Sequence, residues 1–141
     1  MARGRSASVS FQNNIPDLLS QLPEEVESRL LAVAILIEGE VKELLTGQKS
    51  GRWYKIPATN REWQASAPFE SPAVRLGELR RKYRGFTIGQ GIYAEGIVAS
   101  PTIYSKWLEF GTKKMAARPH LRRAAYNVLS QIEGEFEGFF E

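Results

Sequence analysis

Residues 23–47 read Pro-Glu-Glu-Val-Glu-Ser-Arg-Leu-Leu-Ala-Val-Ala-Ile-Leu-Ile-Glu-Gly-Glu-Val-Lys-Glu-Leu-Leu-Thr-Gly, and they predict one long helix. Pro23 suits the first helical position, where the N–H that it lacks would be unbonded anyway. Gly47 marks the expected end of the helix. Helical spacing relates the apolar members Val26, Leu30, Val33, Ala34, Ile37, Val41 and Leu44. Because Leu31, Ile35 and Leu36 are apolar too, we expect this helix to be covered on more than one side.

After this helix, a small antiparallel sheet is expected. Residues 83–90 and 92–100 read as two strands, with Gly89 and Gly91 near the turn between them. A short helical turn over residues 74–82 precedes them. The glycines of this region, which do not follow the pattern of a phosphate-binding loop, are expected at bulges or turns. They are Gly85, Gly89, Gly91 and Gly96.

Further helices are expected toward the C-terminus. Residues 102–110 predict a short helix that ends at Gly111, and residues 119–139 predict a final helix opened by Pro119. The side chains expected to face inward from the short helix are Ile103, Trp107 and Leu108.

Together these elements predict an α+β fold, in which a small antiparallel sheet packs against the long N-terminal helix and a C-terminal helix. At 141 residues the chain is expected to form a single domain, residues 1–141. Residues 1–14 read as a flexible N-terminal arm, and residues 15–19 as a short helical turn.

Residues 48–72 predict a long protruding loop without periodic structure. Loops longer than about 12–15 residues are usually functional or disordered, but disordered tracts rarely carry many aromatic residues. An arm that orders against another subunit satisfies both facts. Its basic and aromatic members are Lys49, Arg52, Trp53, Tyr54, Lys55, Arg61, Trp63 and Phe69.

Composition excludes several classes of function. There is no cysteine, so disulfides, thiolate nucleophiles and Cys-based zinc sites are excluded, which suits synthesis in a cytoplasm. The single histidine, His120, excludes a His-rich metal site, and neither a metal nor a cofactor is expected. The longest apolar run, Leu30 to Ile37, is far shorter than the roughly 20 residues of a membrane span. The basic first residues are followed by no apolar stretch, so no secretory signal is expected.

Charge is unevenly distributed along the chain. Residues 1–48 carry four basic and seven acidic side chains. Residues 49–123 carry fifteen basic and five acidic side chains, and residues 124–141 carry four acidic side chains and no basic ones. The three segments therefore have net charges of −3, +10 and −4. Such a layout can serve nucleic acid, but it can equally serve head-to-tail contacts between copies of one chain.

No catalytic constellation stands out. The glutamates lie on the polar sides of the first and last helices, where solvation explains them without a site. A packing or surface role at a helix terminus explains His120 better than proton transfer does, so a small hydrolase has almost no support. Two basic clusters, at residues 75–84 and 113–123, keep nucleic-acid binding open as an alternative. They lie in no recognisable motif of an RNA-binding sheet, zinc finger or helix-turn-helix.

Three ordered segments resemble a known family. Residues 50–73 contain Ser-Gly-Arg-Trp-Tyr and Ala-Ser-Ala-Pro-Phe-Glu-Ser-Pro-Ala, and residues 77–83 read Gly-Glu-Leu-Arg-Arg-Lys-Tyr. Residues 104–120 contain Tyr-Ser-Lys-Trp-Leu-Glu-Phe-Gly-Thr and Ala-Arg-Pro-His. This order and spacing are similar to the tail-completion, or head–tail joining (neck), minor tail proteins of long-tailed bacteriophages. Two departures are Phe69, where the family usually has Gly, and His120, where it usually has Phe.

The resemblance implies a non-enzymatic virion protein that forms a ring, commonly a hexamer, at the top of the tail. Its partners would be further copies of itself, tail terminator or tail-tube proteins, and head-closure or connector proteins. Genomic DNA would pass through its lumen, and the chain would be made in the host cytoplasm.

The third segment reads physically as a helix stop, a pinned loop and a helix start. We expect Gly111 to have a positive φ and Thr112 to form a hydrogen bond with nearby backbone through its hydroxyl. We also expect Glu109 to form an ion pair with Arg118. The expected structural motif comprises Glu109, Phe110, Gly111, Thr112, Arg118 and Pro119. The candidates for subunit or partner contact are Arg52, Trp53, Tyr54, Trp63, Phe69, Arg80, Arg81, Lys113 and Lys114.

Overall fold

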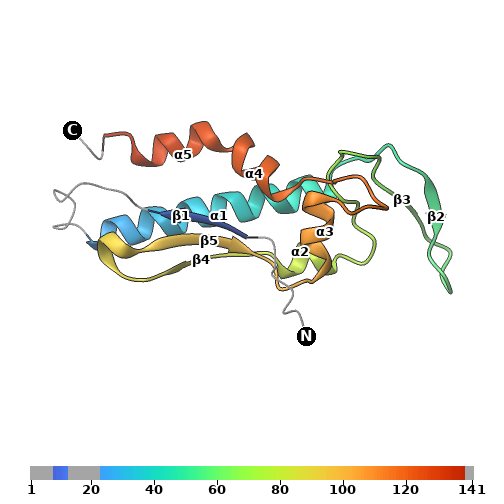
Figure 1. Cartoon of the computed structure of the whole chain (residues 1–141), viewed down its shortest axis with the longest axis horizontal. Coiled ribbons are helices and arrows are strands. Elements are labelled where there is room, and N and C mark those ends of the chain that lie inside the picture. The colour runs from blue at the N-terminus through green and yellow to red at the C-terminus, as the bar shows by residue number, and fades with distance from the viewer. Residues whose placement is uncertain (1–7, 13–22, 139–141) are drawn as a thin grey trace.

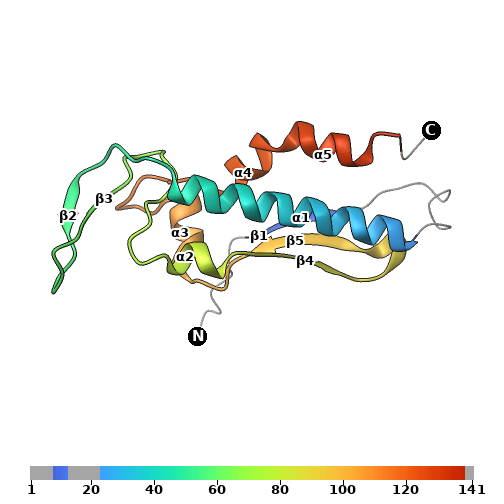
Figure 2. The same ribbon diagram turned by 180° about the vertical axis from the view of Figure 1, so that it is seen from behind.

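The computed structural model describes residues 8–12 and 23–138 and confirms the α+β fold (Figure 1). One long helix lies between a three-stranded antiparallel sheet and two C-terminal helices, as the view from behind also shows (Figure 2). The turn expected at residues 15–19 lies outside the described residues.

Helix α1, Pro23–Thr46, organises the core. Its buried side chains follow the predicted spacing from Val26 to Val41, after which Leu45 is buried and Leu44 only partly so. The sheet covers one side of α1 and the C-terminal helices cover another. The expected coverage is nevertheless incomplete, since Leu31 and Ile35 keep 38% and 54% of their surface exposed.

The main sheet has the strand order β1-β5-β4, with β1 at Ser8–Gln12, β4 at Arg84–Ile88 and β5 at Glu95–Ala99. Both neighbouring pairs are antiparallel, and a 3₁₀ turn, η2 at Gly91–Tyr93, joins β4 to β5. The prediction that residues 1–14 form a flexible arm is therefore wrong for residues 8–12. The alternation in Ser-Val-Ser-Phe-Gln is a strand signal, and the open edge of β5 supplies its hydrogen-bonding partner.

Two glycines of the sheet region differ in role. Gly89 has φ 75° at the end of β4 and is a turn position, as expected. Gly85 is neither a bulge nor a turn residue: it lies inside β4 and faces α1, where a Cβ would overlap the Ala34 carbonyl. Its missing side chain therefore lets the sheet approach the helix closely.

The remaining helices are short. They are α2 (Glu78–Lys82), α3 (Tyr104–Phe110), α4 (Leu121–Asn127) and α5 (Leu129–Phe136). The predicted inward face of α3 is confirmed for Leu108, which packs against the core, and wrong for Ile103 and Trp107, which are 63% and 52% exposed. The buried residues of α3 are Ser105 and Glu109. The single final helix is also wrong. The chain turns at Val128, which is buried between the two helices. The side chain of the neighbouring Asn127 donates a hydrogen bond to the Glu40 carboxylate of α1.

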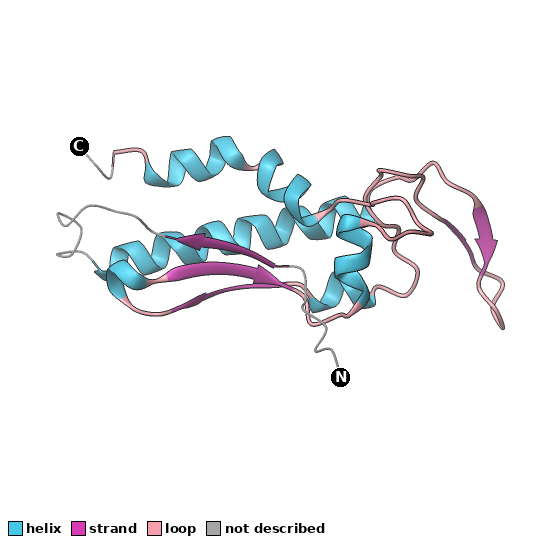
Figure 3. Ribbon diagram, in the orientation of Figure 1, coloured by secondary structure: helices cyan, strands magenta, loops and turns pink. Residues whose placement is uncertain are grey.

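The loop over residues 48–72 does protrude, and it contains a β-hairpin that was not predicted (Figure 3). Strands β2 (Trp53–Lys55) and β3 (Glu62–Gln64) pair antiparallel at one end of the molecule. We call residues 48–72 the arm and residues 52–64 the hairpin.

Candidate assembly site

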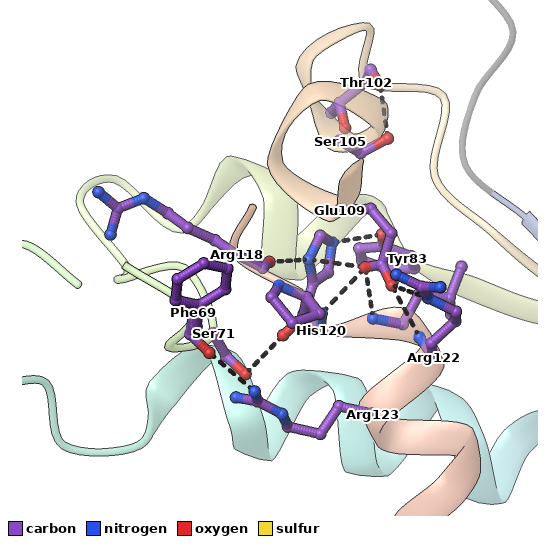
Figure 4. Close-up of polar contacts among 12 residues, drawn as sticks. Phe69, Ser71, Tyr83, Thr102, Ser105, Glu109, Arg118, His120, Arg122 and Arg123 are labelled. Carbon is purple, nitrogen blue, oxygen red and sulfur yellow. Dashed lines mark hydrogen bonds and ion pairs between the residues drawn. The ribbon is translucent and has the colours of Figure 1, made fainter. Parts of the chain in front are cut away.

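The base of the arm lies against the segment from residue 109 to residue 119, which we call the motif segment (Figure 4). The Ser71 hydroxyl, at the end of the arm, donates a hydrogen bond to the Pro119 carbonyl at 3.1 Å. Two regions that the sequence singled out separately are therefore one structural unit.

Glu109 fixes the start of α4 from the neighbouring helix α3. Its carboxylate is buried and accepts hydrogen bonds from the backbone N–H groups of His120 and Leu121 at 2.9 Å and of Arg122 at 3.1 Å. These N–H groups have no partner within the helix. Burial by itself would raise the pKa of the Glu109 carboxyl, but the three N–H groups and His120 together hold it below its ordinary value.

His120 is fully buried in a polar contact with Tyr83. Its Nδ1 lies 3.0 Å from the Arg118 carbonyl and 3.1 Å from Glu109 Oε2, so Nδ1 carries the proton. Nε2 is then the acceptor for the Tyr83 hydroxyl, at 2.7 Å. Burial lowers the pKa of His120 despite the neighbouring carboxylate, and burial together with Glu109 raises the pKa of Tyr83. Of the two roles expected for His120, packing is confirmed and a surface role is wrong.

Arg118 does not pair with Glu109 as expected. Its guanidinium instead donates to the carbonyl and hydroxyl oxygens of Ser66 and, at 2.9 Å, to the Ala67 carbonyl. Its own backbone N–H donates to the Leu108 carbonyl at 2.6 Å. The carboxylate is already occupied by the start of α4, so the arginine is left to fasten the arm to the body.

Gly111 and Thr112 behave as predicted. Gly111 ends α3 with φ 75° and ψ 177°, and a Cβ there would lie 2.8 Å from the Ala117 nitrogen. Only glycine adopts this conformation at low cost. The Thr112 hydroxyl accepts a hydrogen bond from the Lys114 backbone N–H at 3.2 Å, inside a tight turn closed by the Thr112–Met115 bridge.

Phe110 is the aromatic member of the motif, and it is exposed. Its ring is 59% exposed, and the Arg122 guanidinium lies 5.4 Å from the ring centroid. This cation–π contact links the end of α3 to the first turn of α4.

Phe69 stands at the base of the arm with φ 66° and 64% of its surface exposed. Its backbone N–H donates to the Ala117 carbonyl at 3.0 Å, and its carbonyl accepts from Arg123 at 2.7 Å. These two bonds hold a conformation that glycine favours. Phe69 therefore keeps a backbone conformation typical of the Gly that the resembled family usually has here.

Glu70 closes the base of the arm, and its role was not predicted. Its carboxylate accepts from the Ser50 hydroxyl, from the Ser50 N–H at 3.1 Å and from the Ala67 N–H at 2.8 Å. The Ser50 hydroxyl bond and the two N–H bonds lower the pKa of this carboxyl to about 2. The signal was present in the sequence, since the Glu belongs to the motif that carries the family resemblance.

The hairpin carries three of the four aromatic candidates of the arm, and Phe69 lies outside it. Tyr54 and Trp63 stack with ring centroids 5.6 Å apart, and the Arg52 guanidinium lies 5.9 Å from the Tyr54 ring. Arg75, from the chain beyond the arm, lies 5.9 Å from the Trp63 ring. Trp53 alternates to the other side of the hairpin and is 61% exposed.

The basic candidates lie apart from one another. Arg80 and Arg81 are exposed on α2, where Arg81 donates to the Leu76 carbonyl at 3.1 Å. Lys113 and Lys114 are exposed in the turn after α3. The structure therefore brings Arg52, Tyr54 and Trp63 together and places Trp53 on the opposite side of the hairpin. The two arginines of α2 and the two lysines after α3 lie on other surfaces.

Within residues 8–12 and 23–138, no group of three histidine or acidic side chains is placed to hold a metal ion. No helix in that same part of the chain is long and apolar enough to cross a membrane.

A scan against protein-family models finds no match, and searches of curated proteins and of solved structures find no similar chain. The family resemblance therefore rests on the three sequence segments alone.

Proposed function

We propose that this chain is a structural, non-catalytic subunit of the neck of a long-tailed bacteriophage virion. Copies of it form a ring, hexameric in the commonest form of the family it resembles, between the tail tube with its terminator and the head-closure or connector proteins. Genomic DNA passes through the lumen, and the protein is synthesised in the host cytoplasm. The three sequence segments support the family, and the arm supports the role.

The observation that carries the proposal is an arm whose base is fixed and whose tip is free. Arg118 and Glu70 hold the base through hydrogen bonds to Ser66, Ala67 and Ser50. The tip exposes Trp53 and Tyr54, the residue types enriched in protein–protein contacts. An arm held in its binding conformation loses less conformational entropy on association than a loose one does.

Mass measurement of the purified protein tests this proposal most directly. Native mass spectrometry and electron microscopy, with the protein alone and mixed with isolated tail tubes, are expected to reveal a ring that also caps tubes. A strict monomer that binds neither tails nor connectors would contradict the proposal.

A second candidate is a small basic nucleic-acid-binding protein. The favouring observation is the exposed cluster of Arg80, Arg81, Lys82 and Arg84, which spans the end of α2 and the start of β4. Several of these cations are already engaged, since Lys82 pairs with Glu78 at 2.7 Å and Arg84 donates to nearby carbonyls. This candidate predicts DNA affinity that falls steeply with salt. Absence of DNA binding at low salt would remove it.

A further inference from the structure

Strand β4 forms a free edge of the main sheet (Figure 2). It pairs with β5 on one side, and within the described residues no strand pairs with its other side. The Gly85 N–H donates to Glu38 Oε2 at 2.7 Å, so it points away from β5. Because backbone groups alternate in direction along an antiparallel strand, the N–H and C=O of Thr87 point to the same open side. A free strand edge of this kind is a template for pairing with another chain.

Apolar side chains flank this edge in both layers of the fold. On the outer face of the sheet, Phe86 and Ile88 keep 40% and 46% of their surface exposed. In the helix layer, Leu31 and Ile35 of α1 are exposed as well. Edge-to-edge pairing of two copies would bring these four apolar side chains of each copy together, and the burial of apolar surface would favour it.

Two carboxylates of α1 define where the exposed leucine and isoleucine lie. Glu27 and Glu38 are about three helical turns apart on one side of α1. They accept hydrogen bonds from the backbone N–H groups of Gly91 and Gly85, which follow β4 and lie within it. The leucine and isoleucine fall between the two carboxylates at the four-residue spacing of one helix face. They therefore lie along the open side of β4.

Glu38 covers part of the free edge. Its side chain reaches from α1 to the outward Gly85 N–H, and Lys42 and Arg84 stand beside it. Burial alone would raise the pKa of the Glu38 carboxyl, but the hydrogen bonds from Lys42 and Gly85 lower it. An incoming strand would have to displace this carboxylate from Gly85 and bury its charge, which is costly. A charge placed at a sheet edge in this way opposes pairing.

The strand best matched to this edge is the β4 of a second copy. A two-fold axis beside Phe86 sets apolar side chains against apolar side chains in both layers. Arg84 and Lys42 stand toward the end where β4 begins, whereas Glu27 and Glu95 stand toward the end where it finishes. Antiparallel pairing therefore brings the cations of each copy near the carboxylates of the other, which favours this direction.

We propose that Glu38 is a guard that keeps the β4 edge closed to a second copy, and that loss of its carboxylate lets two copies pair through β4. This role goes beyond the proposed ring and does not rest on it. Because a two-fold pair closes on itself, the guard also leaves copies of the chain free for head-to-tail contacts through other surfaces.

Glu38→Ala tests the guard directly, with association measured by analytical ultracentrifugation. We expect this variant to pair at a protein concentration about tenfold or more below that at which the wild type does. The control is Glu43→Ala, which removes an exposed carboxylate from a different side of α1 and is expected to behave as the wild type does. Glu38→Gln keeps an oxygen that can accept the Gly85 N–H but lacks the charge, so a smaller increase in pairing is expected.

Two further substitutions, each combined with Glu38→Ala, show whether β4 makes the contact. Thr87→Pro removes the outward N–H that Glu38 does not cover, at a position where an edge strand tolerates proline. Phe86→Lys sets like charges against each other beside the two-fold axis. Each is expected to return association to the wild-type level. Thermal unfolding verifies that every variant is folded, and if Glu38→Ala is not, Glu38→Gln takes its place in both combinations.

Hydrogen exchange locates the contact in the variant that pairs. The Thr87 N–H is expected to exchange more slowly at high protein concentration than at low concentration, because the strand of the second copy then bonds it. Pairing that both further substitutions suppress, together with this slower exchange, supports the guard.

Three outcomes overturn the guard. The first is a folded Glu38 variant that pairs no more than the wild type. The second is pairing that neither Thr87→Pro nor Phe86→Lys reduces, because the contact then lies elsewhere. The third is equal pairing by Glu43→Ala, since loss of any carboxylate of α1 would then suffice. A wild type that never forms a ring contradicts the proposed function alone and leaves the guard standing.

Discussion

Phe69 carries a backbone strain that glycine would relieve. At φ 66° an L-residue with a Cβ crowds its own backbone, at a cost of about 1–2 kcal/mol. We expect Phe69→Gly to have a free energy of unfolding about 1 kcal/mol above that of Phe69→Ala, because both remove the exposed ring but only Gly removes the Cβ. Urea unfolding of the two variants measures the difference. Equal stabilities would mean that the Ala117 and Arg123 bonds do not impose this backbone conformation.

Glu109 is the residue on which the start of α4 depends. Glu109→Gln replaces a charged acceptor of three N–H bonds with an amide that must turn one N–H₂ group toward other donors. We expect a loss of about 2–3 kcal/mol in the free energy of unfolding. Glu109→Ala serves as the comparison, since it leaves all three N–H groups without an acceptor.

The same carboxylate gives stability a dependence on acid pH. Its folded-state pKa lies below the ordinary 4.5, so its contribution is complete above that value and is lost as the pH falls toward the folded-state pKa. The wild type is therefore expected to lose stability below about pH 4.5, and Glu109→Gln to lose less over the same range. Unfolding midpoints from pH 3 to pH 7 would measure this, and identical slopes would contradict it.

His120 gives a second pH dependence, closer to neutrality. Its folded-state pKa lies below 6.5, so the unfolded chain takes up the proton first and stability falls as the pH drops below 6.5. The slope is at most about 1.4 kcal/mol per pH unit. His120→Phe is expected to remove this slope, but it takes away the Nε2 acceptor of the Tyr83 hydroxyl, whose other side-chain hydrogen bond is with Ser105. The double variant with Tyr83→Phe should recover part of the lost stability, because no buried tyrosine hydroxyl is then left without that acceptor.

At the scale of elements, the arm depends on Arg118 for its attachment to the body. Lysine cannot reproduce a planar guanidinium that reaches Ser66 and Ala67 together. We expect Arg118→Lys to raise the rate of tryptic cleavage within the hairpin about several-fold, through local opening of the arm, with a smaller change in global stability. Mass spectrometry of the digest identifies the cut sites. If cleavage of the core accelerates as much as cleavage of the hairpin, the substitution has destabilised the whole fold instead.

The sequence predicted long elements and missed short ones. Helix α1 has enough turns for its apolar spacing to identify both its type and its buried side, apart from its last turn. Strands β2 and β3 have three residues each, too few for an alternating pattern, so the hairpin was hidden in a predicted loop. Strand β1 depends on a partner 83 or more residues away, which its own sequence does not contain. The break at Val128 likewise follows from its burial against the body.

At the base of the arm, the sequence identified several of the residues that form polar contacts, but it did not identify most of their partners. Gly111 and Thr112 act within a few residues of their own positions, and local sequence rules sufficed for them. Glu109 and Arg118 choose partners by three-dimensional competition, since three N–H groups at the start of α4 occupy the carboxylate first. The Tyr83–His120 contact joins residues 37 positions apart, and no spacing rule announces it.

At the scale of the whole molecule, basic and acidic surfaces lie toward opposite ends of the long axis. The basic hairpin stands at one end of the long axis, whereas Glu133 and Glu135 lie on α5, which runs toward the other end, and Glu137 follows it. A symmetric dimer that paired hairpin with hairpin or α5 with α5 would set like charges against each other, whereas a head-to-tail ring sets opposite charges together between neighbouring copies. The segment charges of −3, +10 and −4 are thus consistent with a repeated contact between unlike surfaces.

We expect salt to weaken the proposed ring without abolishing it. The charged side chains of the hairpin and of α5 are exposed, and a rise in ionic strength from about 0.05 M to 0.5 M shortens the screening length to a few ångströms. Apolar contacts made by the exposed Trp53 and Tyr54 would not be screened, so we expect the concentration for half-assembly to rise several-fold, by about 1 kcal/mol per contact between copies or less. Light scattering across a salt series measures it. DNA affinity would fall by orders of magnitude over the same range, because counterion release scales with every phosphate contacted. Assembly that is strengthened by salt would mean that apolar burial alone holds the copies together and that the charges oppose it.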